Sequence, residues 1–250
     1  MVAFNHDHHK TILAILKALN RPLLEANFAY FGGGTLLALK FGEYRWSQDI
    51  DLICPVQQGG YRGLREAVFY AGYQSLFPDG FPFELPRDIR ADQYGIRFPI
   101  TADGHSIKFE IVAEARIALE APDFPTWCPI PCLSLVDCFA EKLMANADRY
   151  VDTSIRARDL IDLAVLRTHS PIPEKSVQKA EKAYPVIKPL QKAMAIFQSR
   201  PDFRRACFLD LQIVNPCFIM DGIDLLASDF AMPPTKRSLD EELDEDGPTP

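Results

Sequence analysis

Two aspartates separated by a single residue form the pair in this sequence that most strongly suggests chemistry. Asp49 and Asp51 alternate with apolar residues in a short run that Pro55 closes. This alternation predicts a strand with one polar and one buried face, so both carboxylates would leave the same face about 7 Å apart at the backbone. Like charges held this close need a positive partner, and hard divalent cations with oxygen ligands usually supply it. The pair therefore predicts a Mg²⁺ site.

A third carboxylate, Glu110, could join the pair from a second predicted strand. In the run 107–112 the apolar side chains occupy one face, and Glu110 lies on the other. If this strand lies beside the one that carries Asp49, at about 5 Å spacing, the carboxylates could share cations that stabilise the entering and departing oxygens of a phosphoryl displacement. Glu114, or an acid near Asp103, could be the third ligand instead.

A turn of three glycines, residues 32–34, supplies a complementary feature. It follows a short β-prone run and precedes a stretch whose composition suits a helix. Glycine permits positive φ and close backbone approach, so Gly33 and Gly34 can present N–H groups to a triphosphate at the start of that helix. Thr35 could donate its hydroxyl, and Ser47 could hydrogen-bond either phosphate or the local backbone. Taken alone, such a turn is as often steric as phosphate-binding.

Together these features resemble a known family. The segments Phe31-Gly-Gly-Gly-Thr35 and Ser47-Gln-Asp-Ile-Asp-Leu52 are similar to the first motif of the DNA polymerase β-like nucleotidyltransferases. They most resemble the AbiEii/AbiGii branch, the toxins of bacterial type IV toxin–antitoxin and abortive-infection systems. The spacing here is slightly longer than usual, and Tyr44 and Trp46 stand where basic or His residues are frequent, so the nucleotide preference stays open.

The resemblance continues in the second half of the chain. Lys142 and Arg149 share one face of a predicted helix, and Asp159 and Asp162 share a face of the next. Their segments look like the family's lysine helix and its Arg-Asp-x-x-Asp-Leu segment. The resemblance implies that Lys142, with Arg149 nearby, binds nucleotide phosphate and that Asp159 or Asp162 completes the catalytic site. From the spacing alone, an exposed salt-bridged face is the simpler interpretation.

Composition predicts an ordinary globular protein, and the order of the expected strands and helices predicts an α+β fold. The 250 residues are 48% hydrophobic and 24% charged, and no apolar stretch reaches the ~18 residues of a membrane span. The N-terminus lacks the form of a secretory signal, so we expect a cytoplasmic protein. We expect a nucleotidyltransferase domain at 1–128, a helical domain at 129–230 and a disordered acidic tail at 231–250, with nucleotide bound between the two domains.

Periodicity predicts the individual elements. Strands are expected at 28–31 and 49–54, and a hairpin at 94–100 and 106–112 with its turn at Asp103-Gly104. Helices are expected at 9–20, 35–41, 61–72, 133–150 and 155–168, with weaker candidates at 174–183, 188–199 and 203–214.

The charge is unevenly distributed along the chain. The net charge of −7 falls to −1 without residues 238–250, which hold six acids and no base. Residues 140–205 hold thirteen Lys and Arg against eight Asp and Glu. This local excess is compatible with RNA binding but is modest for a nucleic-acid surface.

The combined expectation is a Mg²⁺-dependent enzyme that transfers NMP from an NTP to an acceptor. By resemblance the acceptor is RNA, with tRNA the first candidate, and a separately encoded antitoxin restrains the enzyme. Two alternatives use the same residues. Metal-activated water could instead hydrolyse RNA, or the chain could be a non-catalytic nucleotide-binding module.

Overall fold

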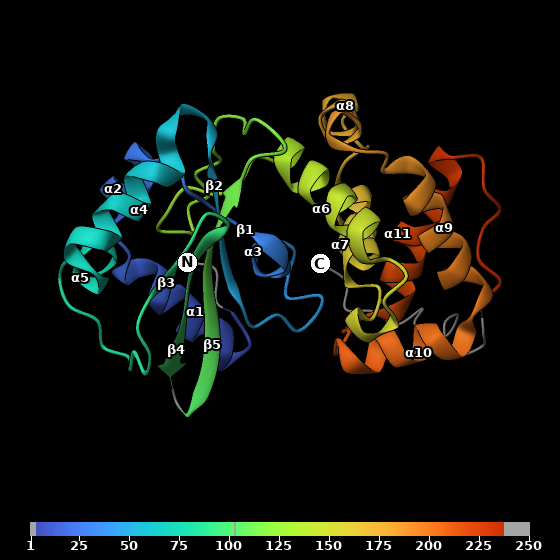
Figure 1. The fold of residues 1–250 in the computed structure, drawn as a ribbon. Coiled ribbons are helices and arrows are strands. Elements are labelled where there is room, and N and C mark those ends of the chain that lie inside the picture. Colours follow the sequence, from blue (N-terminus) through green and yellow to red (C-terminus); the bar gives the residue numbers. More distant parts are fainter. Residues whose placement is uncertain (1–3, 103, 238–250) are drawn as a thin grey trace. The chain divides into compact units, whose positions relative to one another are not determined.

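A computed structural model describes residues 4–102 and 104–237, which form two compact units (Figure 1). The first unit comprises the chain up to Gly42 and Ser47–Cys138, and the second comprises Glu43–Trp46 and the chain from Phe139 onward. The first unit contains strands and helices, whereas the described elements of the second are helical. The α+β fold expected from the sequence is confirmed.

A mixed sheet organises the first unit. Its strand order is β1-β2-β5-β4-β3, with β2 parallel to β5 and the other neighbours antiparallel. The expected hairpin is confirmed. The strand that carries Glu110 lies beside the strand that carries Asp51, which was the condition set for Glu110 to join the aspartates. The strands are β1 Tyr30–Gly32, β2 Ile50–Pro55, β3 Arg90–Ala91, β4 Gly95–Ala102 and β5 His105–Glu114.

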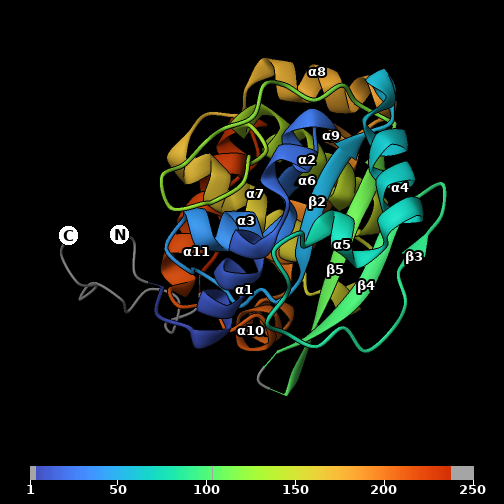
Figure 2. The same ribbon diagram turned by 90° about the vertical axis from the view of Figure 1, so that its left-hand side faces the viewer.

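Helices α4 and α5 lie over one face of this sheet (Figures 1 and 2). That face is apolar, because strand alternation turns fully buried side chains such as Ile50, Phe109 and Ile111 toward it. Phe77, directly after α5, packs edge-on against Phe98 and Phe109. The opposite face therefore carries the polar side chains of β2 and β5. The helices of the first unit are α1 Asp7–Ala18, α2 Arg21–Ala26, α3 Gly33–Lys40, the short 3-10 helix η1 Gln57–Gly59, α4 Gly60–Ala71 and α5 Tyr73–Leu76.

Helix α6 begins in the first unit and continues into the second, where α7 and α11 pack closely. A Cβ at Gly222 of α11 would lie 2.5 Å from the carbonyl oxygen of Ala164 on α7. Glycine at this position therefore allows the two backbones to approach. The elements are α6 Leu135–Arg149, η2 Thr153–Ile155, α7 Arg158–His169, α8 Glu174–Ala183, α9 Ile187–Ser199, α10 Pro201–Asp210 and α11 Pro216–Asp229.

Most of these helices were predicted, but α2, α5 and α11 were not. The buried residues of helix α11 recur at the three- and four-residue spacing of one helix face, so the periodic signal was present in the sequence. Its start is also well specified, because Asn215 accepts a hydrogen bond from Phe218 N and Pro216 occupies the first turn. Within the described residues, every helix is too short or too polar to cross a membrane.

The chain beyond α11 is described as far as Arg237. There Thr235 donates two hydrogen bonds, from N and Oγ1, to Asp224 Oδ1 at 2.8 and 2.7 Å. Buried Arg204 donates to the carbonyl oxygen of Lys236. Residues 238–250, which include all of the acid run expected to be disordered, lie outside the described residues.

Candidate active site

The glycine turn brings backbone and carboxylate into contact. Gly33 opens α3 with φ +70°, a left-handed conformation that favours glycine. A Cβ at Gly33 would lie 2.3 Å from Asp51 Oδ2, so the Asp51 side chain fills the space that another residue would need. The N-cap residue, Gly32, has no side chain with which to cap α3. Because Gly33 and Gly34 are half-exposed, this turn can present backbone N–H groups to an anion.

Thr35 and Ser47 hydrogen-bond within the protein. Thr35 is buried, and its hydroxyl donates to the backbone carbonyl of Asp49 at 2.5 Å. A hydroxyl has a single proton to donate, so Ser47 Oγ is the donor in its 2.8 Å contact with Thr35 Oγ1. His9 Nε2 also donates to the Ser47 carbonyl, at 3.0 Å. These bonds fix the segment that enters β2, so Thr35 and Ser47 position Asp49, and nucleotide contact by either residue stays a prediction.

The three predicted carboxylates fall on neighbouring positions. Asp49 directly precedes β2, and Asp51 is the register partner of Glu110 on β5. Register partners on adjacent strands leave the same face of the sheet at about 5 Å spacing. All three residues are partly exposed, and the Glu110 side chain is 12% exposed. The structure therefore brings Asp51 and Glu110 together on the polar face, with Asp49 two positions before Asp51.

Two basic side chains of the same face neutralise Glu110. Arg97, its register partner on β4, donates from Nε to Glu110 Oε1 at 2.5 Å, and Lys108 bonds to Oε2. Burial raises the pKa of Glu110, but the hydrogen bonds from Lys108 and Arg97 outweigh it and leave the pKa below its ordinary value. A divalent cation at Glu110 would therefore compete with both bases.

The alternative third ligands are Glu114 and Asp103. Glu114 is buried at the end of β5, where its Oε1 accepts from the backbone N–H groups of Arg116 and Ile117. Its Oε2 accepts from the Arg116 guanidinium at 2.6 Å. The carboxylate is thus already satisfied by its own loop. Asp103 lies outside the described residues.

The donor chemistry fits Mg²⁺, although the side chains are not gathered into a ligand cluster. Across residues 4–102 and 104–237, no group of three or more His, Cys, Asp or Glu side chains is arranged to hold a metal ion. Asp49, Asp51 and Glu110 nevertheless offer the hard carboxylate oxygens that Mg²⁺ prefers. Their convergence on a cation stays a prediction, and it requires Glu110 to exchange its present partners.

Four charged residues of the second unit form one ion network. They are the residues that helical spacing placed on shared faces in the sequence. Lys142 Nζ lies 2.6 Å from Asp162 Oδ2 and 3.1 Å from Asp159 Oδ1. Arg149 donates to Asp159 from Nε at 2.6 Å and from Nη2 at 2.9 Å. The expected salt bridges are present, but the expected exposure is wrong, because Lys142, Asp159 and Asp162 are buried.

In this network the paired charges shift the pKa values more than burial does. Burial raises the pKa of Asp159, but Lys142 and Arg149 hold it well below its ordinary value. Burial lowers the pKa of Lys142, but Asp162 and Asp159 raise it above its ordinary value. The members are therefore charged at neutral pH, and removing one of them would leave a buried charge unpaired.

Tyr44 and Arg45 complete the network and were not predicted as members. Arg45 donates from Nε and Nη2 to the two oxygens of Asp162 at 2.6 and 2.9 Å, and Tyr44 Oη donates to Oδ1 at 2.6 Å. Both residues are buried. The available signal was one arginine between two aromatic residues, Tyr44 and Trp46. An arginine buried in such a setting needs a carboxylate partner.

Comparisons with known proteins give one family match. The family model described as "Nucleotidyl transferase AbiEii toxin, Type IV TA system" matches residues 14–206. A search of curated proteins finds no match. Among solved structures, one from H. pylori whose description proposes a nucleotidyltransferase aligns with a TM-score of 0.47 and 18% identity over 90% of this chain and 92% of its own. JHP933 from Helicobacter pylori aligns with a TM-score of 0.47 and 18% identity over 89% and 90%.

Proposed function

We propose, from the premise that the chain belongs to the AbiEii family of nucleotidyltransferase toxins of type IV toxin–antitoxin systems, that it transfers NMP from an NTP to RNA in a Mg²⁺-dependent reaction. Family membership makes the chain a nucleotidyltransferase with an NTP substrate and a cognate antitoxin. The metal, the acceptor and the residue roles are our proposals. The observation that carries them is the register pairing of Asp51 with Glu110 beside Gly33.

Asp49, Asp51 and Glu110 would hold the Mg²⁺. A bound divalent cation supplies neutralisation of negative charge at the reacting phosphate oxygens. The backbone N–H groups of Gly33 and Gly34 would bind the triphosphate, with the N-terminus of α3 favouring its negative charge. Thr35 would hold the Asp49 segment in place through its bond to the Asp49 carbonyl. The acceptor hydroxyl would bond to the α-phosphorus as the bond to pyrophosphate breaks, and its proton would pass to water.

Lys142 and Arg149 would neutralise nucleotide phosphate. In the second unit, Lys142, Arg149 and Arg45 contact the carboxylates of Asp159 and Asp162. These five side chains carry three positive and two negative charges, which leaves a net positive charge. We propose that Asp159 and Asp162 orient the cations. Asp159 would then support catalysis by positioning Lys142 and Arg149.

The acceptor we propose is RNA, with tRNA the first candidate. The basic excess of residues 140–205, thirteen Lys and Arg against eight Asp and Glu, supports a polyanionic acceptor. In the cell, modification of such an acceptor would arrest growth until the antitoxin restrains the enzyme. A cytoplasmic location accompanies this proposal.

The test supplies each of the four NTPs, labelled at the α-phosphate, with Mg²⁺ and total cellular RNA. We expect label on RNA of unchanged length, and loss of that label when EDTA replaces Mg²⁺. Shortened, unlabelled RNA would instead identify a metal-dependent ribonuclease.

The matched variants are Asp49→Asn with Asp51→Asn, and Asp79→Asn as an exposed control in the same unit. We expect the double variant to lose transfer and toxicity, and the control to keep both. A double variant that still binds NTP and still arrests growth would identify a non-catalytic nucleotide-binding module.

A further inference from the structure

One register row crosses the whole sheet from the glycine turn to its far edge. Gly32 pairs with Asp51, Asp51 with Glu110, Glu110 with Arg97, and Arg97 with Arg90. Register partners leave the same face, so the row changes from acidic to basic as it passes from β2 to β3. Three strand spacings, roughly 15 Å, separate the backbones of Asp51 and Arg90. A polyanion that ends at Asp51 would therefore meet both arginines.

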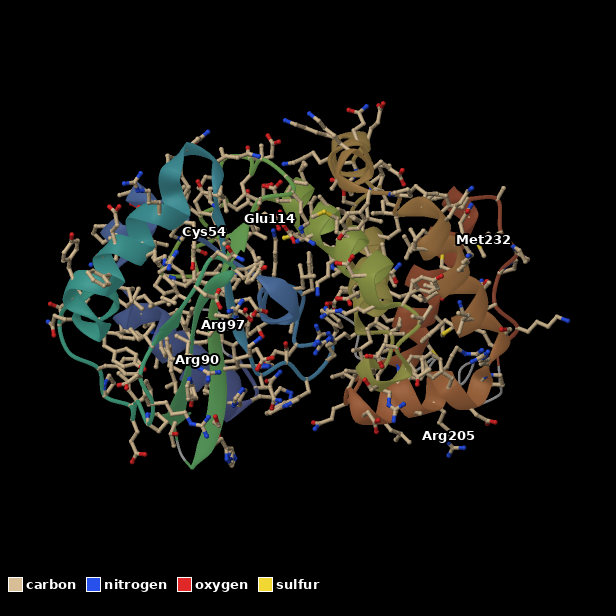
Figure 3. All side chains as sticks on the ribbon, viewed as in Figure 1. Cys54, Arg90, Arg97, Glu114, Arg205 and Met232 are labelled. Atoms are coloured by element: carbon tan, nitrogen blue, oxygen red, sulfur yellow. The ribbon has the colours of Figure 1, made fainter. Side chains whose placement is uncertain are left out.

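Arg90 is the exposed end of this row. Figure 3 shows Arg90 and Arg97 on neighbouring strands. Arg97 is one-third exposed and shares its guanidinium between Glu110 and Asp92. Arg90 is exposed on the edge strand β3, and no hydrogen bond or ion pair engages its side chain among the residues that the structure describes. Its charge is therefore available to a phosphate.

A hollow of about 380 Å³ lies on the other side of β3. Ala91, the neighbour of Arg90, lines it together with Arg65, Asp88 and the aromatic residues Phe69 and Tyr73. This volume falls in the ~300–1,000 Å³ range of small-ligand pockets. At its rim Phe69 is 81% exposed, and the next residue, Tyr70, is 83% exposed. Large aromatic rings are costly to leave in water, which indicates that this surface binds a partner.

The composition of this rim suits a single nucleic-acid strand. Exposed aromatic rings stack on nucleobases, and guanidinium groups bind the backbone. Asp88 adds a carboxylate that can accept hydrogen bonds from the amino group of a base. The row that contains Asp51 ends at Arg90, and the next residue, Ala91, lines the hollow. This connection favours the acceptor over a protein partner, because only the acceptor must also reach Asp51.

We propose that a single-stranded segment of the acceptor RNA crosses the β3 edge, with phosphates on Arg97 and Arg90 and a base stacked on Phe69 beside Asp88. This acceptor path rests on the proposed function, since it assumes that the strand ends at Asp51. It adds an RNA-binding surface in the first unit, made of residues other than the basic excess of residues 140–205. It also implies a preference for bases with an exocyclic amino group over uracil.

The experiment measures binding of fluorescent oligo(A) and oligo(U) to the full chain by anisotropy, without NTP and with EDTA. We expect Phe69→Ala to weaken oligo(A) binding about tenfold, the loss of one stacked base. Arg90→Gln should weaken it severalfold and reduce the salt dependence by about one counterion. Asp88→Asn should reduce the preference for oligo(A) over oligo(U).

The matched controls are Arg205→Gln and Phe124→Ala, both exposed side chains outside the path. They should bind as the unaltered chain does. Absent binding by the unaltered chain, equal binding by the Phe69 and Arg90 variants, or equal losses in the controls would each overturn the path. So would loss of antitoxin binding, with RNA binding intact, in the Phe69 variant, because it would assign the surface to a protein partner.

Pyrophosphate release from NTP, measured in parallel, separates this proposal from the proposed function. If NTP turnover fails while the binding pattern holds, the proposed transfer is wrong and the RNA surface stands. If turnover depends on Asp51 while the variants bind RNA normally, the path is wrong and the transfer stands.

Discussion

The two groups of carboxylates in this protein differ in how their charge is compensated. Asp49, Asp51 and Glu110 are partly exposed, and the bases that neutralise Glu110 come from its own sheet. Asp159 and Asp162 are fully buried and surrounded by cations. A half-exposed carboxylate can exchange its counterion for a metal, whereas a buried pair cannot do so cheaply. The first group is therefore suited to chemistry and the second to fixing cations in place.

The largest predicted effect removes a carboxylate of the first group. We expect Asp51→Asn to reduce NMP transfer by about 10³-fold or more. The proposed metal ligands act together, so loss of one removes most of the catalytic effect of all three. Its melting temperature should change by no more than about 2 °C, because a half-exposed carboxylate contributes little to folding. Steady-state transfer and thermal unfolding measure the two quantities. An Asp51 variant that is strongly destabilised but still active would show that Asp51 serves folding and not chemistry.

Removing a carboxylate of the second group should affect folding first. Asp162→Ala leaves Arg45 buried without its carboxylate and Lys142 with Asp159 alone, and an unpaired buried charge typically costs about 3–5 kcal/mol. We expect urea unfolding to show a loss of that size. Asp210→Ala, at an exposed salt bridge with Arg156, serves as the control and should cost less than about 1 kcal/mol. Similar midpoints for the two variants would contradict the burial argument.

The glycine turn offers a sharper test of how Asp51 is positioned. Gly33→Ala places a Cβ 2.3 Å from Asp51 Oδ2, whereas Gly59→Ala meets nothing within 4 Å. Both positions have positive φ, +70° and +78°, so the backbone strain of about 1 kcal/mol is shared. We expect a roughly 10–100-fold loss of transfer in the Gly33 variant alone. Equal losses would mean that strain, and not the contact with Asp51, explains the effect.

The smallest predicted effect is on acid stability. Asp159 has a pKa well below its ordinary value when folded, so its stabilising contribution is complete above the ordinary value and is lost as the pH falls toward the folded value. The unfolded value is about 3.9. We therefore expect the free energy of unfolding of Asp159→Asn to fall less steeply than that of the unaltered chain below about pH 4. Glu110→Gln should flatten the curve less, because the pKa of Glu110 is lowered less than that of Asp159.

Local pattern was sufficient to predict the elements that hold the carboxylates. Alternation at Asp49 and Asp51 predicted β2, and the same alternation at Glu110 predicted β5. Whether the two strands pair could not be predicted, because pairing and register depend on the chain between them. The sequence could state only that Glu110 joins the aspartates if they pair. The bond from Arg97 to Glu110 depends on the register of β4 with β5 and could not be anticipated. Lys108 lies two residues before Glu110 on the same strand face, so its proximity was visible in the sequence.

The second group was harder to predict because its burial depends on tertiary contacts. Spacing paired Lys142 with Arg149 and Asp159 with Asp162, but the same spacing suits an exposed helix face. Arg45 is distant in sequence from Asp162, and no local rule joins them. Residues 43–46 belong to the second unit and supply that partner. The arginine between Tyr44 and Trp46 indicated burial with a carboxylate but did not indicate which carboxylate.

The most direct measurement of the central claim is Mn²⁺ binding, followed by electron paramagnetic resonance in the presence of a non-hydrolysable NTP analogue. Mn²⁺ prefers the same oxygen ligands as Mg²⁺. The account predicts saturable binding to the unaltered chain and to Asp79→Asn, and binding weakened at least about tenfold in Asp51→Asn, equivalent to ~1.4 kcal/mol. Equal Mn²⁺ affinity in all three proteins would contradict a metal held by the Asp51 row.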